Sequence, residues 1–261
     1  MLARDYPYFE AGFLAFAHRG GAELPANRGR ENTLHAFGQA VELGYRYLET
    51  DVHATADGVL VAFHDDKLDR VTDGTGKIAE LPWSEVSQAK IGGHDPIPRL
   101  VDVLVAFPDT RFNIDAKAAG AVDLLADTIE HLGVHERVCV SSFSVRRLLR
   151  LRSRLGRRVA SSMSKVGVAY TRFLPFLPDR FGTTGQALQI PVATTVLGRR
   201  VTLVTEALVD RAHGLGKQVH VWTIDDPAEM VRLIDLGVDG IMTDRPDVLR
   251  EVLVERGLWD Q

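Results

Sequence analysis

Histidines and carboxylates gather between His18 and Asp65, each near the end of a strand-like run. Residues 47–52 have the pattern of a strand, whose period of two places Glu49 and Asp51 on one face, about 7 Å apart. Two carboxylates at that distance repel each other unless a cation lies between them. The spacing therefore predicts a divalent-metal site with titratable imidazoles beside it.

A predicted hairpin brings the second histidine to this acidic pair. Asp57 and Gly58 form a strong two-residue turn signal, and residues 59–64 have the pattern of a return strand. With those two residues as the turn, the ladder sets Asp51 opposite His64. A slip of one residue would change the partner of Asp51 but leave His64 beside the carboxylates.

Length and composition are those of an ordinary globular protein. The chain has 261 residues, 45% of them apolar and 25% charged, which suffices for one large barrel or two smaller domains. A net charge of −4 argues against nucleic acid as the main partner. The single cysteine, Cys139, lies in an apolar run. We expect it to be a small buried hydrophobic residue. Because the chain has one cysteine, it can form neither an intrachain disulfide nor a cysteine-rich zinc site.

The first residues give no sign of a targeting segment. Residues 1–12 carry Arg4, Asp5 and Glu10 and lack the continuous apolar core of a signal peptide. No apolar run approaches the roughly 18 residues that identify a membrane-spanning helix. We therefore expect a soluble cytoplasmic protein with no regular membrane contact.

Strand-like and helix-like patterns alternate along the chain. Strands are predicted at 13–17, 47–52, 112–115, 138–142, 159–161, 188–190, 218–223 and 240–242. Helices are predicted at 33–43, 100–107, 121–132, 145–155, 206–215, 227–236 and 246–256. Alternation of this kind demands a parallel sheet, and eight units in about 250 residues are what a (β/α)₈ TIM barrel needs.

One polar, glycine-rich segment, 66–95, breaks the alternation and is predicted to be a small insertion after the second strand. We expect the whole chain, 1–261, to form a single α/β barrel domain around it. An open doubly wound sheet is the alternative architecture. No Gly-x-Gly-x-x-Gly follows a strand, which argues against that alternative.

Function in such a barrel gathers where the strands end. Asn113, Asp115 and Lys117 share one face of their strand, so Asp115 can be a third carboxylate at the same centre. Carboxylate oxygens favour Mg²⁺ or Ca²⁺ over zinc. The chemistry-bearing residues at predicted strand ends are His18, Arg19, Glu49, Asp51, Asp115, Lys117, Ser141, Ser142, Trp222, Thr243 and Asp244.

Several blocks in this order resemble the glycerophosphodiester phosphodiesterases, over about residues 14–247. The blocks are His18-Arg19-Gly20, Glu31-Asn32-Thr33, Glu49-Thr50-Asp51-Val52, Asp57-Gly58, His64-Asp65, Asn113-Ile114-Asp115-Ala116-Lys117, Ser142-Phe143, Trp222-Thr223 and Gly237 to Pro246. The resemblance implies a (β/α)₈ barrel with an insertion after the second strand. It also implies metal-dependent hydrolysis of small-molecule glycerophosphodiesters to glycerol 3-phosphate and an alcohol.

The resemblance also assigns residues to roles. It implies that Glu49, Asp51 and Asp115 hold one divalent ion, Mg²⁺ or Ca²⁺, and that His18 and His64 are the acid/base pair. Two groups of near-neutral pKa suit proton transfer to and from a phosphodiester. The sequence leaves open which of the two histidines is the base and which the acid.

Three further residues belong to the expected substrate site. The resemblance implies that Arg19 and Lys117 face phosphate oxygens, whose growing charge needs neutralising. Trp222 is either barrel core or a wall for the glycerol moiety. The family usually has Glu where this chain has Asp115, and a lengthened loop here carries Arg28 and Arg30, which either alter substrate choice or are solvated loop charges.

Other features leave alternatives open. Prolines in 170–181 argue against a regular helix there, and its apolar side chains predict either a lid that accepts an acyl chain or a loop packed on the barrel. The basic run 146–158 is expected to be a solvated helix face, with an anionic membrane surface as the lesser alternative. The alternative functions are a lysophospholipase D acting on lysophospholipids and a catalytically silent metal- or phosphate-binding barrel.

The remaining histidines match none of these blocks, and we predict structural roles for them: His35, His53, His94, His131, His135, His213 and His220.

Overall fold

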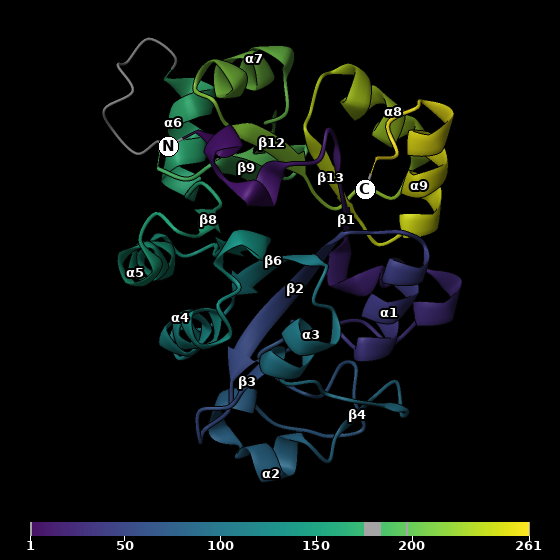
Figure 1. Ribbon diagram of the computed structural model, residues 1–261, viewed down its shortest axis with the longest axis vertical. Coiled ribbons are helices and arrows are strands. Elements are labelled where there is room, and N and C mark those ends of the chain that lie inside the picture. Colours follow the sequence, from purple (N-terminus) through teal and green to yellow (C-terminus); the bar gives the residue numbers. More distant parts are fainter. Residues whose placement is uncertain (1, 175–183, 197, 261) are drawn as a thin grey trace.

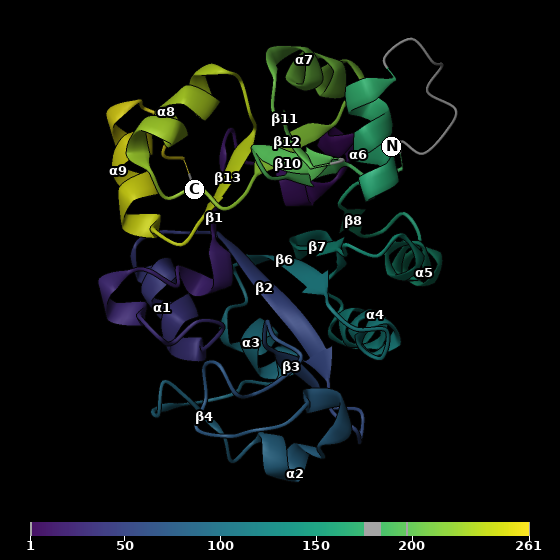
Figure 2. The same cartoon turned by 180° about the vertical axis from the view of Figure 1, so that it is seen from behind.

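The computed structural model describes residues 2–174, 184–196 and 198–260. Its parallel strands form a nearly closed barrel in the order β8-β7-β6-β2-β1-β13-β12-β9, and a single parallel bridge between Ser162 and Ala187 joins the two ends (Figures 1 and 2). The predicted TIM barrel is therefore confirmed. The strands are β1 (Leu14–Ala17), β2 (Tyr47–Ala54), β6 (Arg111–Ala116), β7 (Val138–Ser141), β8 (Ala160–Ser161), β9 (Ala187–Ile190), β12 (Gln218–Val221) and β13 (Gly240–Thr243).

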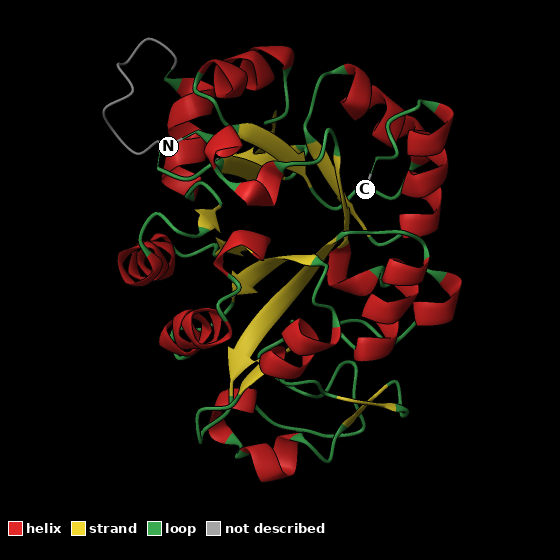
Figure 3. Ribbon diagram, viewed as in Figure 1, coloured by secondary structure: helices red, strands yellow, loops and turns green. Residues whose placement is uncertain are grey.

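Helices surround this barrel, as Figure 3 shows. They are α1 (Leu34–Glu42), α3 (Leu100–Ala106), α4 (Ala121–Leu132), α5 (Val145–Leu155), α6 (Lys165–Phe173), α7 (Glu206–Gly214), α8 (Pro227–Asp235) and α9 (Pro246–Glu255). Helices α4 and α5 have the predicted bounds. A side-chain cap explains the start of α5, because Ser144 Oγ accepts a hydrogen bond from the Arg147 amide.

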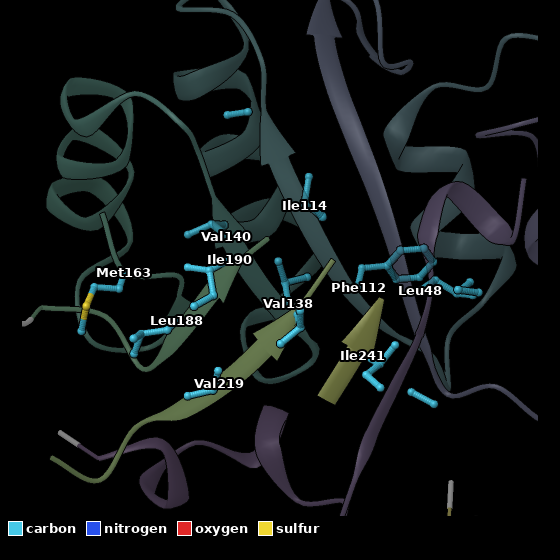
Figure 4. Packing of buried hydrophobic residues seen from close by; sticks show 14 of the residues in the cluster. Leu48, Phe112, Ile114, Val138, Val140, Met163, Leu188, Ile190, Val219 and Ile241 are labelled. Carbon is cyan, nitrogen blue, oxygen red and sulfur yellow. The ribbon is translucent and has the colours of Figure 1, made fainter. Parts of the chain in front are cut away.

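The main core lies between the strands and the outer helices (Figure 4). A second cluster fills the barrel interior near the N-terminal ends of the strands, where Tyr8, Phe16 and Tyr47 pack together. Cys139 belongs to this second cluster and is fully buried, as predicted. Because both faces of the sheet are covered, β1 and β2 are buried along their whole length.

The hairpin after β2 differs from the predicted register by one residue. Strand β3 (Leu60–Ala62) pairs so that Phe63, not His64, lies opposite Asp51, and the Phe63 amide donates to the Asp51 carbonyl at 2.9 Å. The turn has three residues because Thr55 already pairs with Val59, and Gly58 takes the left-handed conformation that closes such a turn. His64 nevertheless stays beside the acidic pair.

The insertion 66–95 follows this hairpin and lies at the end of the molecule below β3 in Figure 1. It contains the short helix α2 (Trp83–Val86) and the strand pair β4 (Lys90–Ile91) and β5 (Asp95–Pro96). Leu68, Ile78 and Ile91 form a small apolar core of its own with Phe63. The insertion is thus a packed unit fixed to the return strand.

Two features after β8 were not predicted. Helix α6 continues through Phe173, so the expectation of no regular helix in 170–181 is wrong for 170–173. The first proline, Pro175, disfavours helical backbone at the residue before it, Leu174, where the helix has ended. The apolar side chains of Phe173 and Leu174 are about half exposed. The rest of the proposed lid, including Phe176, Leu177 and Phe181, lies outside the described residues. A hairpin of β10 (Ala193–Val196) and β11 (Arg199–Thr202) follows β9.

Within the described ranges, none of the helices has the length and apolar character needed to cross a bilayer.

His220 makes a testable contribution to stability. Its ring is fully buried against Phe16, and burial lowers its pKa to about 3. Below pH 6.5 this histidine binds a proton in the unfolded chain but not in the folded chain. The free energy of unfolding therefore falls by up to about 1.4 kcal/mol for each pH unit below that value. Between pH 7 and pH 5, urea unfolding should show a smaller fall in the free energy of unfolding for His220→Gln than for the parent protein. Equal slopes for the parent and His220→Gln would contradict this, and His35→Gln, at a partly exposed histidine, is the control.

Candidate active site

A cavity of about 500 Å³ opens at the C-terminal end of the barrel strands. The structure brings all eight predicted site residues to its wall, from loops and strands that are far apart in the sequence. They are His18, Arg19, Glu49, Asp51, His64, Asp115, Lys117 and Trp222.

Neighbouring strands place the three carboxylates. Glu49 and Asp51 share one face of β2, and parallel pairing sets Asp51 beside Asp115 of β6. All three side chains are buried. Burial and the charge of Asp51 raise the pKa of Glu49 to about 8, which shows how strongly this acidic centre resists full ionisation.

Two cations offset this charge. Lys117 Nζ lies 2.8 Å from Asp51 Oδ1 and 2.9 Å from Asp115 Oδ2, and Arg19 Nε lies 3.4 Å from Asp51 Oδ2. Burial opposes the ionisation of Asp51, but Lys117 and Arg19 outweigh it and hold its pKa below the usual value. The Arg19 amide also donates to Glu49 Oε2 at 3.2 Å.

The donor set suits a hard divalent cation, although its ligands are not gathered into a cluster. Among the residues that the structure describes, no three His, Cys, Asp or Glu side chains converge as a metal centre. Both buried oxygens of Asp115 lack a hydrogen-bond partner of good geometry, and burial raises the pKa of this carboxyl despite Lys117. Carboxylate oxygens that are buried and incompletely satisfied fit Mg²⁺ or Ca²⁺.

Each site histidine is held by its own aspartate. His18 Nδ1 lies 2.7 Å from Asp244 Oδ1, and His64 Nδ1 lies 2.6 Å from Asp65 Oδ1. Burial disfavours the charged His18 ring, but Glu49 and Asp244 outweigh it and raise its pKa above the usual value. Because Nδ1 is engaged in both rings, Nε2 is the nitrogen left for a substrate.

Sequence reasoning missed a residue that links the two histidine positions. Arg70, from the insertion, donates to Asp65 Oδ2 at 2.6 Å and to Glu31 Oε1 at 2.7 Å, and Glu31 in turn pairs with Arg19. Arg70 together with His64 lowers the pKa of Asp65 to about 2. No local pattern marks Arg70, because only the folded insertion brings it to the site.

Asp244 was noted at a strand end without a role. Its contact with His18 spans 226 positions and depends on the pairing of β1 with β13. Asn32, from one of the matched blocks, takes a positive φ of 59° and accepts from Thr50 Oγ1 at 2.7 Å. That contact fixes the loop that follows His18 and Arg19 against strand β2.

One side of the cavity is apolar. Trp222 meets Phe143 edge to face at 5.5 Å between ring centroids, so it forms part of the wall. The rest of this side comes from the loop after β8, from α6, β9 and the β10–β11 region, and consists of Met163, Val168, Phe173, Ile190, Val196 and Leu203. The cavity therefore joins a charged half to an apolar half.

The basic residues flagged in the sequence lie elsewhere. Arg30 pairs with Asp95 of the insertion, and neither Arg28 nor Arg30 lines the cavity. In the basic run 146–158, three arginines pair with acidic residues of helix α4: Arg150 with Asp123, Arg154 with Asp123 and Asp127, and Arg158 with Glu130. These pairs agree with a solvated outer face.

Comparison with known proteins identifies the family to which this sequence and fold correspond. The profile of the Glycerophosphoryl diester phosphodiesterase family matches residues 18–248. The chain belongs to this family. Over 257 residues this family member is 42% identical to the Probable glycerophosphodiester phosphodiesterase 2 of Mycobacterium tuberculosis, covering 95% of this chain and 94% of that protein. It is 30% identical to the human Lysophospholipase D GDPD1, covering 91% of this chain and 85% of that protein.

Solved structures share the fold of this family member. A putative glycerophosphodiester phosphodiesterase from Galdieria sulphuraria superposes with a TM-score of 0.77 at 24% identity, covering 94% of this chain and 98% of that one. A phosphodiesterase from Oleispira antarctica, in complex with the product sn-glycerol-3-phosphate, gives 0.75 at 23% identity, covering 92% and 96%.

Proposed function

We propose that this chain hydrolyses glycerophosphodiesters to glycerol 3-phosphate and an alcohol. One observation carries the proposal: two histidines, each oriented by an aspartate, face a single cavity with three buried carboxylates and two cations. That combination suits in-line displacement at phosphorus. The family relationship and the names of the relatives support it.

Proton transfer falls to His18 and His64. One ring takes a proton from the attacking water or glycerol hydroxyl through Nε2, and the other gives a proton to the leaving alkoxide. Asp244 and Asp65 hold the two rings in one tautomer and orientation. Each aspartate also stabilises the imidazolium that forms when its ring is protonated.

Glu49, Asp51 and Asp115 would hold one divalent ion, Mg²⁺ or Ca²⁺. Such an ion, when bound, supplies charge neutralisation and Lewis acidity at the phosphoryl group. Arg19 and Lys117 lie on either side of Asp51 and add two fixed positive charges that attract and orient the anionic diester. Trp222 forms the wall against which the glycerol moiety packs.

A second candidate substrate is a lysophospholipid. The apolar half of the cavity adjoins the charged half, so an acyl chain can extend from a bound phosphodiester over Val168, Phe173 and Ile190. Human and rodent relatives of about 30% identity carry the name lysophospholipase D. A silent binding barrel is disfavoured, since both proposed proton-transfer groups are present. We further propose a single domain and a cytoplasmic location.

Release of glycerol 3-phosphate from glycerophosphocholine by the purified protein tests the proposal. We expect release to fall to background in EDTA and to return with Mg²⁺ or Ca²⁺, because the three carboxylates would lose their ion. Lysophosphatidylcholine in the same assay separates the two substrate classes. Absence of release from glycerophosphocholine, glycerophosphoethanolamine, glycerophosphoglycerol and lysophosphatidylcholine with every metal would overturn the proposed activity.

A further inference from the structure

Helix α6 exposes an unusual face. A surface helix normally turns charged and polar residues to solvent, but the exposed residues of α6 include Val166, Ala169 and Phe173, spaced three and four apart on one side. Val166 is 61% exposed and Phe173 46% exposed. The residue after the helix, Leu174, is exposed to a similar degree. In both views α6 lies at the edge of the barrel (Figures 1 and 2).

The same region is rich in basic residues. Between Ala160 and Thr205 the sequence has one acidic residue, Asp179, which lies outside the described residues, although the chain as a whole has a net charge of −4. Four cations stand among the exposed apolar side chains or beside them: Lys165 and Arg172 on α6, and Arg199 and Arg200 on β11. The surface formed by residues 165–174 and 193–202, where described, is called here the α6–hairpin surface.

This surface borders the mouth of the active-site cavity. Phe143, Phe173 and Val196 line the cavity and are each more than 40% exposed. Lys165 Nζ lies 4.9 Å above the Phe143 ring, and Arg172 Cζ lies 5.2 Å above the Phe173 ring. Each cation therefore sits on an aromatic face with its charged end near solvent, an arrangement typical of side chains at a lipid interface.

We propose that the α6–hairpin surface docks on an anionic phospholipid bilayer. Exposed aliphatic and aromatic side chains would enter the headgroup region, and the four cations would meet lipid phosphates. On helix α5, by contrast, Arg150 and Arg154 pair with carboxylates of α4. Since the docking surface borders the mouth of the cavity, a phosphodiester that carries an acyl chain can enter it from the bilayer.

Vesicle sedimentation tests the docking without reference to catalysis. The probe is phosphatidylcholine vesicles containing about a third phosphatidylglycerol, compared with pure phosphatidylcholine. We expect the protein to bind the anionic vesicles more tightly. The Val166→Ser/Leu174→Ser variant should bind about tenfold more weakly, and Arg199→Gln and Arg200→Gln about fivefold more weakly each. None of these four residues lines the cavity.

Two controls make the result specific. Val254→Ser changes an equally exposed valine on α9, away from this surface, and should bind like the parent protein (Figure 1). Turnover of water-soluble glycerophosphocholine should be unchanged in every variant, which separates docking from the proposed hydrolysis. Equal binding by the surface variants and Val254→Ser would overturn the proposal. So would absence of vesicle binding together with a dimer that the surface variants dissociate, since the partner would then be a second copy.

Discussion

Alanine in place of His18 or His64 is expected to lower kcat for glycerophosphocholine hydrolysis by about 10²- to 10⁴-fold. Each ring lines the cavity, and each has Nδ1 held by an aspartate, which fixes Nε2 for proton transfer. Alanine removes the proposed proton carrier and keeps the three carboxylates that we propose to bind the metal. KM should change far less than kcat, because binding of the diester rests mainly on positive charge.

His35→Ala is the matched control for these two variants. The His35 side chain is partly exposed, contacts the Ala26 carbonyl through Nε2 and does not line the cavity. Its kcat should stay within about twofold of the parent value, as expected for a surface change. If either site variant kept more than about a tenth of the parent kcat, that histidine would not carry a proton in the rate-limiting step.

The second large effect is expected at Asp51. The Asp51→Asn substitution should lower the free energy of unfolding in EDTA by about 3 kcal/mol, because it leaves buried cations without their central counter-charge. Lys117 lies 2.8 Å and Arg19 3.4 Å from this carboxylate, and the lowered pKa of Asp51 indicates that its charge is stabilised in the fold. In the variant, Lys117 still pairs with Asp115 and Arg19 with Glu31. We therefore expect a loss at the lower end of the range found for broken buried ion pairs.

Urea unfolding measures this loss, and Asp102→Asn provides its control. Asp102 pairs with Arg99 on the surface, where an ion pair contributes at most about 1 kcal/mol. With Mg²⁺ or Ca²⁺ present, Asp51→Asn should also lower kcat/KM at least about a hundredfold, because changing even a residue that only orients a metal ligand costs about 10- to 100-fold. A variant as stable as the parent would mean that the repulsion between Glu49 and Asp51 already cancels the attraction of the cations.

Local patterns predicted much of this molecule. The shared face of Glu49 and Asp51 and the inward position of Asp115 were predicted from a period of two, and the bounds of α4 and α5 follow from helical spacing and a glycine or serine at the boundary. These signals depend on a residue and its near neighbours. They can therefore be recognised in the sequence alone, and the matched blocks added His18, His64, Arg19 and Lys117 to the predicted site.

Features set by distant partners were missed or displaced. The hairpin register shifted because Thr55 pairs with Val59 and closes a longer turn, a choice that the Asp57-Gly58 signal does not contain. Arg70 and Asp244 reach the site only through the folded insertion and through β13. The β10–β11 pair was overlooked because its strands are exposed and lack the apolar alternation of a core strand.

The pairing of β1 with β13 has a consequence for folding during synthesis on the ribosome. Strand β1 is made first, yet His18 gains its aspartate partner only when residue 244 has emerged and the last strand has docked beside the first. Until then the imidazole has no fixed tautomer. We therefore expect a chain in which β13 has not yet docked beside β1 to lack the proposed proton transfer through His18.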